Sequence, residues 1–252
     1  MTMSDRFMLT GKRALVTGAA RGIGYAISAA YAGAGADVIM LDVAPAIRDA
    51  AAKLKAASAG NVRAVHADVT DARGLAAALS GVNQLDVLVN NAGIAYETPV
   101  DDVRDDAVEM FRRIIDVNVL GVYVMTRVAL PLMGRGGRII NTSSAWGKGA
   151  GPMFSAYVAS KHAVIGLTRS WAMELGPRGI AVNAVCPGTT ATEMNYEHLP
   201  RPAQEKLFSQ MVIDQGFIPP DDLAQTFLFL ASPAASPITG QALSADRGQV
   251  MM

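Results

Sequence analysis

Short apolar runs alternate with longer segments of helical periodicity along all 252 residues of the chain. The alternation predicts strands at Ala14–Thr17, Asp37–Leu41, Val62–Ala67, Asp86–Asn90, Arg138–Thr142, Ile180–Cys186 and Gln241–Ser244. It predicts helices at Ile23–Ala34, Ala46–Ala57, Ala72–Leu79, Asp106–Met133 and Ala156–Leu175. Such alternation is typical of βαβ units, which build a parallel sheet with helices on both faces. We therefore expect an α/β fold, a doubly wound parallel sheet of seven strands, with ligands at the carboxyl ends of the strands.

No linker, repeat or low-complexity block divides the sequence, so we expect residues 1–252 to form a single domain. One long interruption of the pattern, at about 189–219, is rich in Thr, Met, Pro and Gln. Long excursions between regular elements are often lids or binding loops, and few apolar anchors would let this one open easily. We expect a substrate loop here that becomes more ordered when ligand binds.

Composition excludes several classes of function. Apolar residues make up 51% of the chain, and 22 Lys and Arg residues balance 22 Asp and Glu residues. Zero net charge argues against nucleic-acid or anionic-membrane partners, which need a positive surface. A single cysteine, Cys186, excludes an intramolecular disulfide, and three scattered histidines predict no metal site. Because the N-terminal residues lack a signal-peptide core and no apolar run reaches membrane-span length, we expect a cytoplasmic protein.

A glycine-rich turn, Thr17–Gly24, follows the first predicted strand and opens the first helix. Glycines let the backbone approach a pyrophosphate, which the helix N-terminal amides then bind. The spacing G-x-x-x-G-x-G differs from the commoner G-x-G-x-x-G, but its place between strand and helix favours a dinucleotide over an empty turn. We therefore expect a Rossmann-like, dinucleotide-binding domain. The turn residues expected at the cofactor are Gly18, Arg21, Gly22, Ile23 and Gly24.

Asp42 follows the second predicted strand, about twenty residues beyond the glycines. A carboxylate there can accept hydrogen bonds from the adenosine ribose hydroxyls and would repel a 2′-phosphate. Arg21 is the opposing feature, because a cation in the glycine turn could pair with that phosphate. Val43 supplies no second cation. The balance predicts NAD as the cofactor, with NADP as the alternative.

Tyr157 and Lys161 are spaced i, i+4, so a helix places them on one face. A phenol with a pKa of about 10 acts as a base near neutral pH only if its anion is stabilised, and a neighbouring ammonium does this. Ser144 follows the fifth predicted strand, where its hydroxyl could bond a substrate oxygen or only cap a turn. Each feature is common by chance, so none alone identifies a catalytic site.

Taken together, the motifs from about residue 10 to residue 246 resemble those of the short-chain dehydrogenase/reductase family. Thr17–Gly24 matches the family's TGxxxGxG turn, and Asn90–Gly93 is similar to its NNAG motif. The family's Asn-Ser-Tyr-Lys tetrad falls on Asn118, Ser144, Tyr157 and Lys161. The resemblance implies a catalytic domain that moves a hydride between a nicotinamide cofactor and a secondary alcohol or its ketone.

Further cofactor contacts are implied by the same resemblance. Asp68 and Val69 resemble the pair that touches the adenine ring, and Pro187–Thr192 resembles the segment that grips the nicotinamide carboxamide. With the glycine turn, the residues expected at the cofactor are Asp42, Asp68, Val69, Asn91, Ala92, Gly93, Tyr157, Lys161, Pro187, Gly188, Thr190 and Thr192. One departure is Arg247, which stands where the family has a glycine and puts in doubt the local turn and any tail contact with a neighbouring subunit.

The implied mechanism gives each member of the tetrad one task. Tyr157 takes the hydroxyl proton as the hydride leaves for the nicotinamide. Lys161 lowers the pKa of the phenol and bonds the nicotinamide ribose, and Ser144 orients the substrate oxygen. Asn118 interrupts the long helix near its middle and holds a water in a proton relay with Lys161.

The substrate is the least constrained part of the prediction. The pocket is expected at Ser144, Trp146, Phe154, Tyr157 and Met194. Further positions that could reach it are Ile94, Ala95, Tyr96, Met153, Tyr196, His198, Phe208 and Met211. This mostly apolar set favours a medium-sized secondary alcohol or ketone of low or mixed polarity. A 3-oxoacyl thioester reductase, a sugar or polyol dehydrogenase and a non-catalytic NAD-binding scaffold stay open as alternatives.

Assembly is the last expectation. The helices predicted at Asp106–Met133 and Ala156–Leu175 carry more apolar residues than one sheet face can cover. Family members pair these two helices across a two-fold axis. We therefore expect a homotetramer or homodimer.

Overall fold

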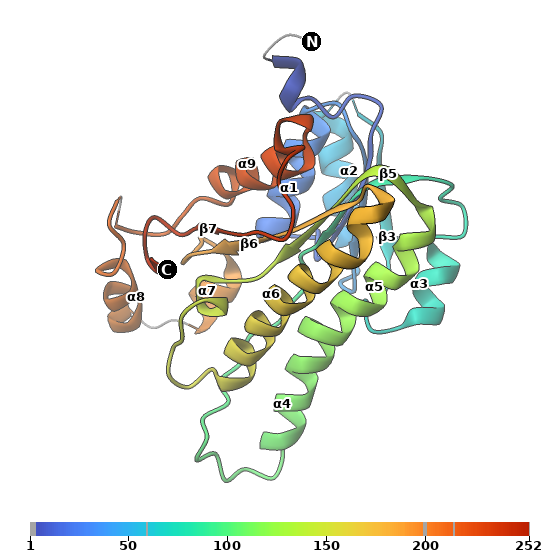
Figure 1. The fold of residues 1–252 in the computed structure, drawn as a ribbon. Helices are drawn as coiled ribbons and strands as arrows, with labels where there is room; N and C mark the ends of the chain where they lie inside the picture. Colours follow the sequence, from blue (N-terminus) through green and yellow to red (C-terminus); the bar gives the residue numbers. More distant parts are fainter. Residues whose placement is uncertain (1–3, 59, 199–200, 214, 252) are drawn as a thin grey trace.

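The computed structural model describes residues 4–58, 60–198, 201–213 and 215–251. Its centre is a seven-stranded sheet in the order β3-β2-β1-β4-β5-β6-β7, with every neighbouring pair parallel (Figure 1). The strands are β1 Arg13–Thr17, β2 Asp37–Asp42, β3 Val62–His66, β4 Leu85–Asn90, β5 Met133–Thr142, β6 Ala181–Pro187 and β7 Ala242–Ala245. This confirms the predicted doubly wound parallel sheet.

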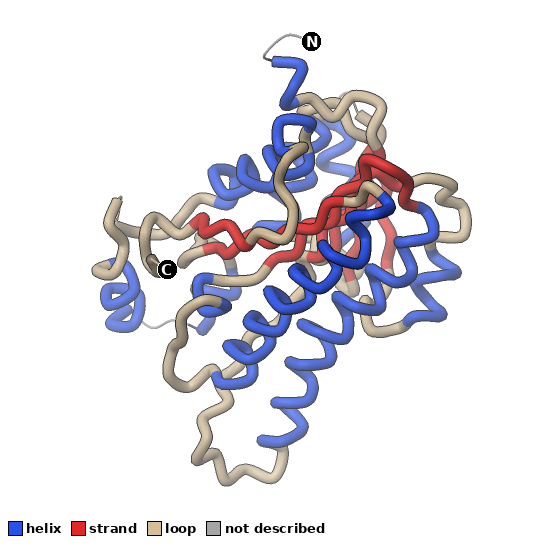
Figure 2. Tube along the Cα trace, viewed as in Figure 1, coloured by secondary structure: helices blue, strands red, loops and turns tan. Residues whose placement is uncertain are grey.

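Helices cover both faces of the sheet, as Figure 2 shows. One face packs against α1 (Gly22–Gly33), α2 (Ile47–Ala57) and α9 (Pro220–Ala231). The other packs against α3 (Ala72–Ala78), α5 (Gly121–Ala129) and α6 (Ser155–Leu175). Successive strand side chains point to opposite faces, so Leu15 joins the second core and Val16 the first. Because both faces are buried, the strands are continuous apolar runs, which is why the sequence reveals them.

The long helix predicted at Asp106–Met133 is interrupted in its middle. α4 (Ala107–Ile115) passes into a π turn at Asp116–Leu120 and then into α5, and a 3₁₀ turn at Leu130–Leu132 ends the run. The predicted end at Met133 is wrong: Pro131 lies in the closing turn, and Met133 already pairs with Leu85 as the first residue of β5.

This run of helix, Ala107–Leu132, is also long and apolar enough to pass for a membrane span by length and composition. This differs from the prediction that no apolar run reaches membrane-span length. In the fold, 44% of its most apolar window is buried, and α5 packs on the sheet within the second core. A core helix of a folded domain passes the same test.

The segment 189–219, hereafter the lid segment, has more structure than predicted. It contains two short helices, α7 (Glu193–His198) and α8 (Arg201–Phe208). Its two ends are tied together, because Ile218 donates its N–H to Thr189 O at 2.9 Å. Met211 and Ile218 are buried anchors, and the Phe217 ring packs edge-on against its neighbours within the segment. The predicted scarcity of apolar anchors is therefore wrong for the second half of the segment.

Candidate active site

A cavity of about 680 Å³ lies across the carboxyl ends of the strands. The loops that follow β1, β2, β3, β4, β5 and β6 all contribute to its lining, and it extends from Asp42 at one end to Tyr157 at the other. β1 and β4 are neighbours in the sheet although they are far apart in sequence, so the chain reverses its winding between them. Ligands of doubly wound sheets bind at this point.

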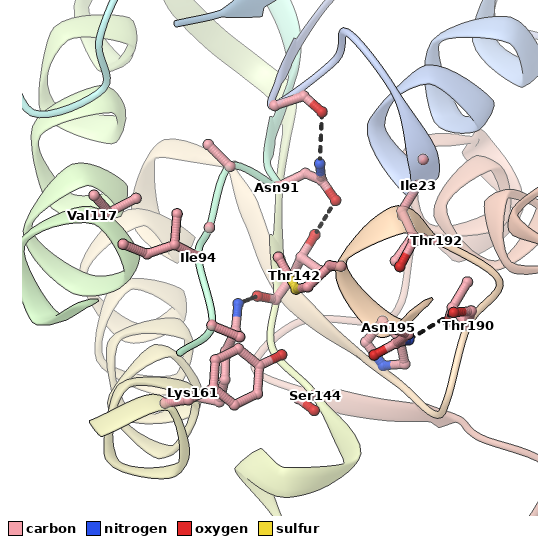
Figure 3. A pocket seen from close by; sticks show the side chains of 18 of the residues that line it. Ile23, Asn91, Ile94, Val117, Thr142, Ser144, Lys161, Thr190, Thr192 and Asn195 are labelled. Carbon is pink, nitrogen blue, oxygen red and sulfur yellow. Dashed lines mark hydrogen bonds between the residues drawn. The ribbon is translucent and has the colours of Figure 1, made fainter. Parts of the chain in front are cut away.

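The glycine turn and the strand β4 loop hold each other in place. Gly18 has φ +64°, and a Cβ on it would lie 2.8 Å from Ala92 Cα. A Cβ on Gly24 would overlap the Gly18 carbonyl oxygen. Asn91 donates its side-chain N–H to Thr17 O at 3.0 Å and to Gly18 O at 3.2 Å (Figure 3). Only glycine fits these positions, so the motif and its Asn partner together shape the turn.

The amino end of α1 is suited to an anion. Arg21 occupies its N-cap with extended backbone, and no side chain caps the helix. Its first amides therefore have no side-chain acceptor while facing the cavity, which is the arrangement that binds a pyrophosphate. Across the cavity, the Thr192 methyl lies 3.2 Å from the place of a Cβ on Gly22, so the lid segment closes over the turn. A dinucleotide fits these residues.

Asp42 is held with its carboxylate at the cavity wall. One oxygen accepts the N–H of Ala20 at 3.0 Å, and the other accepts the N–H of Ala44 at 2.8 Å. The side chain is half-buried and forms no ion pair with any residue that the structure describes. His66 braces the following loop through a 2.8 Å bond to Val43 O. The carboxylate therefore keeps free lone pairs and an uncompensated charge at this end of the cavity.

At the opposite end, α6 places Tyr157 and Lys161 on one face beside Ser144, as the i, i+4 spacing predicts. Lys161 Nζ donates to Thr142 O at 2.9 Å and lies 5.4 Å from the centre of the Tyr157 ring (Figure 3). Both side chains line the cavity, yet Lys161 is only 5% exposed. The three groups that the resemblance implies for proton transfer thus meet at one point.

Burial dominates the acid–base properties of these groups. It raises the pKa of the Tyr157 phenol, with a hydrogen bond from Ser144 acting in the opposite direction. It lowers the pKa of Lys161 to about 8. The raised phenol pKa differs from the predicted lowering by Lys161, because loss of water around the phenol outweighs the neighbouring groups in the ligand-free protein. Tyr157 is therefore a neutral hydroxyl at neutral pH, ready to donate a proton.

Asn118 lies in the π turn and is fully buried, so it does not line the cavity. Its Oδ1 accepts the N–H of Ile94 at 2.8 Å, and its Nδ2 donates to Ile94 O and to Ser160 Oγ. A π turn in a helix often marks a functional position. Here it lets one side chain fix both the loop after β4 and the helix that carries Tyr157.

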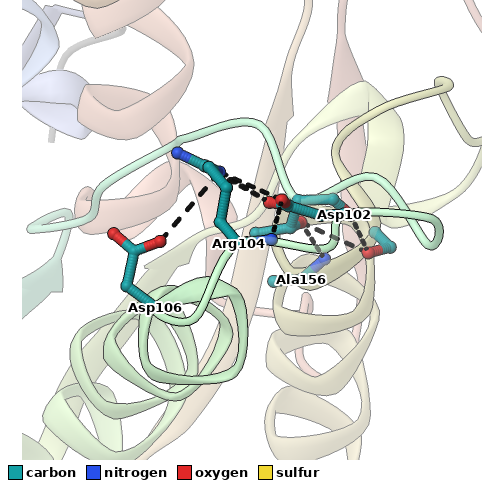
Figure 4. Close-up of polar contacts among 6 residues, drawn as sticks. Asp102, Arg104, Asp106 and Ala156 are labelled. Atoms are coloured by element: carbon teal, nitrogen blue, oxygen red, sulfur yellow. Dashed lines mark hydrogen bonds and ion pairs between the residues drawn. The ribbon is translucent and has the colours of Figure 1, made fainter.

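The start of α6 is capped from outside by the loop after β4. Thr98 Oγ1 accepts the N–H of Ala156 at 3.0 Å, and Thr98 N donates to Met153 O (Figure 4). Farther along the same loop, Arg104 forms a bidentate pair with Asp102, with a shortest distance of 2.7 Å. The two Thr98 bonds fix the amino end of α6 within one turn of Tyr157.

An aromatic wall borders the catalytic end of the cavity. The Trp146 ring lies 5.4 Å from that of Phe154 and 6.2 Å, edge-on, from that of Tyr157. A Cβ on Gly151 would lie 2.5 Å from the indole, so the glycine packs flat against it. Met194 continues the wall from the lid segment. All five predicted pocket residues are thus brought together.

Some of the other predicted residues line the cavity and some do not. Ile94 and Ala95 line the cavity, and so do all predicted cofactor residues except Gly24, which serves the packing of the turn. Residues that do not line it are Tyr96, Met153, Tyr196, Phe208 and Met211, and the side chain of His198 lies outside the described part. Lining residues that were not predicted from the sequence include Glu109, Arg113, Asp116, Val117, Asn195, Leu207 and Gln249. Glu109, Arg113 and Val117 are spaced four residues apart, and this helical spacing could have indicated that they share the face that lines the cavity.

Comparisons with known proteins agree with this geometry. The sequence model of the family described as Enoyl-(Acyl carrier protein) reductase matches residues 18–249. The chain is 39% identical over 249 residues to the 3-oxoacyl-[acyl-carrier-protein] reductase FabG of Thermotoga maritima, covering 96% of this chain and 99% of that protein. It is 34% identical over 255 residues to the D-beta-hydroxybutyrate dehydrogenase of Rhizobium meliloti, covering 94% and 98%.

Solved structures give the same result. A short chain dehydrogenase from Burkholderia cenocepacia in complex with NADP superimposes with a TM-score of 0.86 at 37% identity, covering 96% of this chain and 98% of that one. A 3-oxoacyl-[acyl-carrier protein] reductase with bound NAD from Brucella melitensis superimposes with 0.87 at 33% identity, covering 100% and 97%. The fold and the cavity define an oxidoreductase that uses a nicotinamide dinucleotide. The chain belongs to the short-chain dehydrogenase/reductase family.

Proposed function

We propose that this enzyme interconverts a secondary alcohol and its ketone with NAD, using Tyr157 as the acid–base group. The observation that carries the proposal is the meeting of Ser144, Tyr157 and Lys161 at one end of a cavity whose other end holds the glycine turn and Asp42. Bound in this cavity, the nicotinamide would supply the hydride carrier.

The side chains divide the remaining work. In ketone reduction the neutral Tyr157 hydroxyl donates its proton to the carbonyl oxygen, and in alcohol oxidation the same oxygen takes the proton back. Ser144 donates to the substrate oxygen and stabilises its developing charge. Lys161, held by Thr142 O, stabilises the phenolate that forms when Tyr157 loses its proton. Asn118 positions the helix of Tyr157 through its bond to Ser160.

NAD is the cofactor that Asp42 favours. Two backbone N–H groups fix this carboxylate at the cavity wall, where it would accept from the ribose hydroxyls and repel a 2′-phosphate. Arg21 is exposed and opposes this preference. In our proposal the fixed carboxylate determines the cofactor preference, because water screens the charge of an exposed arginine on a flexible side chain.

A 3-oxoacyl thioester is the second candidate substrate. The relative from Thermotoga maritima carries that activity in its name, and the wall of Trp146, Phe154 and Met194 would accept an acyl chain. The same wall disfavours a sugar or polyol, because it offers few hydrogen-bonding groups.

A panel of ketones and alcohols tests the proposal. Turnover is followed by nicotinamide absorbance with NAD and NADP side by side. The expected result is oxidation or reduction of apolar or mixed-polarity substrates, faster with the NAD pair. Turnover of sugars alone would contradict the substrate assignment, and no turnover of any alcohol or ketone would contradict the proposed function.

A further inference from the structure

The turn that follows β7, residues 246–250, is built into the wall of the active site; we name it the C-terminal turn. Arg247 O accepts the N–H of Val212, at 2.9 Å, and joins the turn to the lid segment. Val250 packs against Gly149 in the loop that follows Ser144, with 3.3 Å between Val250 Cγ2 and the place of a Cβ on Gly149. Asp246 is buried and accepts backbone N–H groups from within the turn. The turn thus bridges two parts of the candidate site.

Gln249 is the member of this turn whose side chain lines the cavity. Its Oε1 accepts both the N–H of Thr189, at 3.2 Å, and the Thr189 hydroxyl, at 3.3 Å. An N–H can only donate, so the oxygen of the amide must face Thr189 and the nitrogen must face away. Within the part of the chain that the structure describes, Gln249 Nε2 donates to no acceptor. Gln249 therefore holds an amide with two free donor hydrogens at the part of the cavity that it lines.

The sheet order places Gln249 at the substrate end. Asp42 ends β2, near one edge of the sheet, and Gln249 follows β7, the strand at the opposite edge. Ser144 follows β5 and Thr189 follows β6, so both lie between these extremes and on the side of Gln249. A dinucleotide that reaches from Asp42 to Tyr157, with its carboxamide against the loop after β6, leaves the space beside the turn after β7 for the substrate.

We propose that Gln249 binds the substrate by donating an amide hydrogen to a carbonyl oxygen other than the one that is reduced. The reacting oxygen is already served by Ser144 and Tyr157, and the aromatic wall offers an apolar contact instead. The substrate class this selects is a ketone that carries a second carbonyl nearby, such as a 3-oxo ester or thioester. This inference rests on the proposed function, since it assigns the substrate of that same site.

The test compares two neutral ketones of equal length. One is ethyl acetoacetate, and the other is its analogue in which a methylene replaces the ester carbonyl. The quantity measured is the ratio of kcat/KM for the ester to kcat/KM for the analogue. In Gln249→Glu, both carboxylate oxygens still accept from Thr189, but the amide donors are gone, so the anchor is kept while the donor is lost.

The expected result is a wild-type ratio well above one that falls about tenfold in Gln249→Glu, the loss of one buried hydrogen bond. Gln241→Glu is the matched control, because Gln241 is exposed and does not line the cavity, and its ratio should equal that of the wild type. An unchanged ratio in Gln249→Glu overturns the inference, whether or not both rates fall together, and leaves the proposed function standing. A wild type that turns over other ketones of the panel but not ethyl acetoacetate overturns the inference alone, and a wild type that turns over no alcohol or ketone overturns both.

Discussion

Lys161 Nζ lies 5.4 Å from the centre of the Tyr157 ring, and burial shifts the pKa of both groups away from their charged forms. The pKa of the phenol rises, and that of the ammonium falls to about 8. At neutral pH Tyr157 therefore holds its proton, and Lys161 keeps most of its charge below its pKa of about 8. That distribution suits donation to a carbonyl, and Lys161 supplies charge when the phenolate forms.

The lowered pKa of Lys161 predicts a pH dependence of stability for the ligand-free enzyme. Between about pH 8 and pH 10.5 the unfolded chain keeps a proton that the folded protein has lost, so the free energy of unfolding rises with pH in that window. The slope contributed is at most about 1.4 kcal/mol per pH unit. Lys161→Met should lack it. Urea unfolding from about pH 7 to about pH 9 measures the difference, and parallel pH profiles for the two proteins would contradict the burial effect.

Asp42 is predicted to set the preference for NAD over NADP. The wild type should favour NAD over NADP in kcat/KM by about tenfold or more, and Asp42→Ala should narrow that gap by a similar factor, because the fixed charge near the ribose is removed. Asp37→Ala is the control, since Asp37 begins the same strand and pairs with Arg13 away from the cavity. Equal or better use of NADP by the wild type would mean that Arg21 dominates.

Arg247 adopts φ +54°, a left-handed backbone that favours glycine. Arg247 also has a further interaction, so a single change to glycine mixes the loss of the side chain with the relief of the backbone. The comparison of Arg247→Ala with Arg247→Gly separates them, because both remove the side chain and only one keeps a Cβ. We expect the glycine variant to be more stable than the alanine variant by about 1 kcal/mol in urea unfolding. An alanine variant of equal or greater stability would show that the turn is not strained.

Self-association is predicted from the outer faces of α4, α5 and α6 and the π turn between α4 and α5. Large apolar side chains exposed there are Val108, Phe111, Leu120, Tyr123 and Met173. Monomeric proteins rarely leave so much apolar surface in one region uncovered. We expect light scattering at micromolar concentration to report a homotetramer or homodimer, and Leu120→Glu together with Tyr123→Glu to shift it to a smaller species. A monomeric wild type would contradict this prediction.

Features of the fold and the site that depend on local sequence pattern were predicted correctly. Buried parallel strands are apolar runs, and Gly18 and Gly22 occupy backbone conformations that only glycine adopts freely, so both are visible in the sequence. The spacing of Tyr157 and Lys161 needs only helical geometry to become a shared face. These features sufficed for the fold, the dinucleotide site and the catalytic end of the cavity.

What the sequence could not predict depends on contacts between distant segments. Nothing local identifies Thr98 as the cap of α6, or Gln249 as a cavity residue, because each meets its partner only through the sheet order. The direction of the Tyr157 pKa shift depends on how completely the folded chain excludes water from the phenol. The lid segment looked polar on average, yet Met211 anchors it by burial in the folded chain.

Replacement of Tyr157 by phenylalanine tests the central claim most directly. The change removes only the hydroxyl, so the ring keeps its packing against Trp146 and the fold and nicotinamide-cofactor affinity should be retained. The measurement is kcat for ketone reduction beside the cofactor dissociation constant of the same preparation. We predict a fall in kcat of roughly 100- to 10,000-fold with an unchanged dissociation constant. A Tyr157→Phe enzyme that keeps more than about a tenth of the wild-type kcat would contradict the assignment of Tyr157 as the acid–base group.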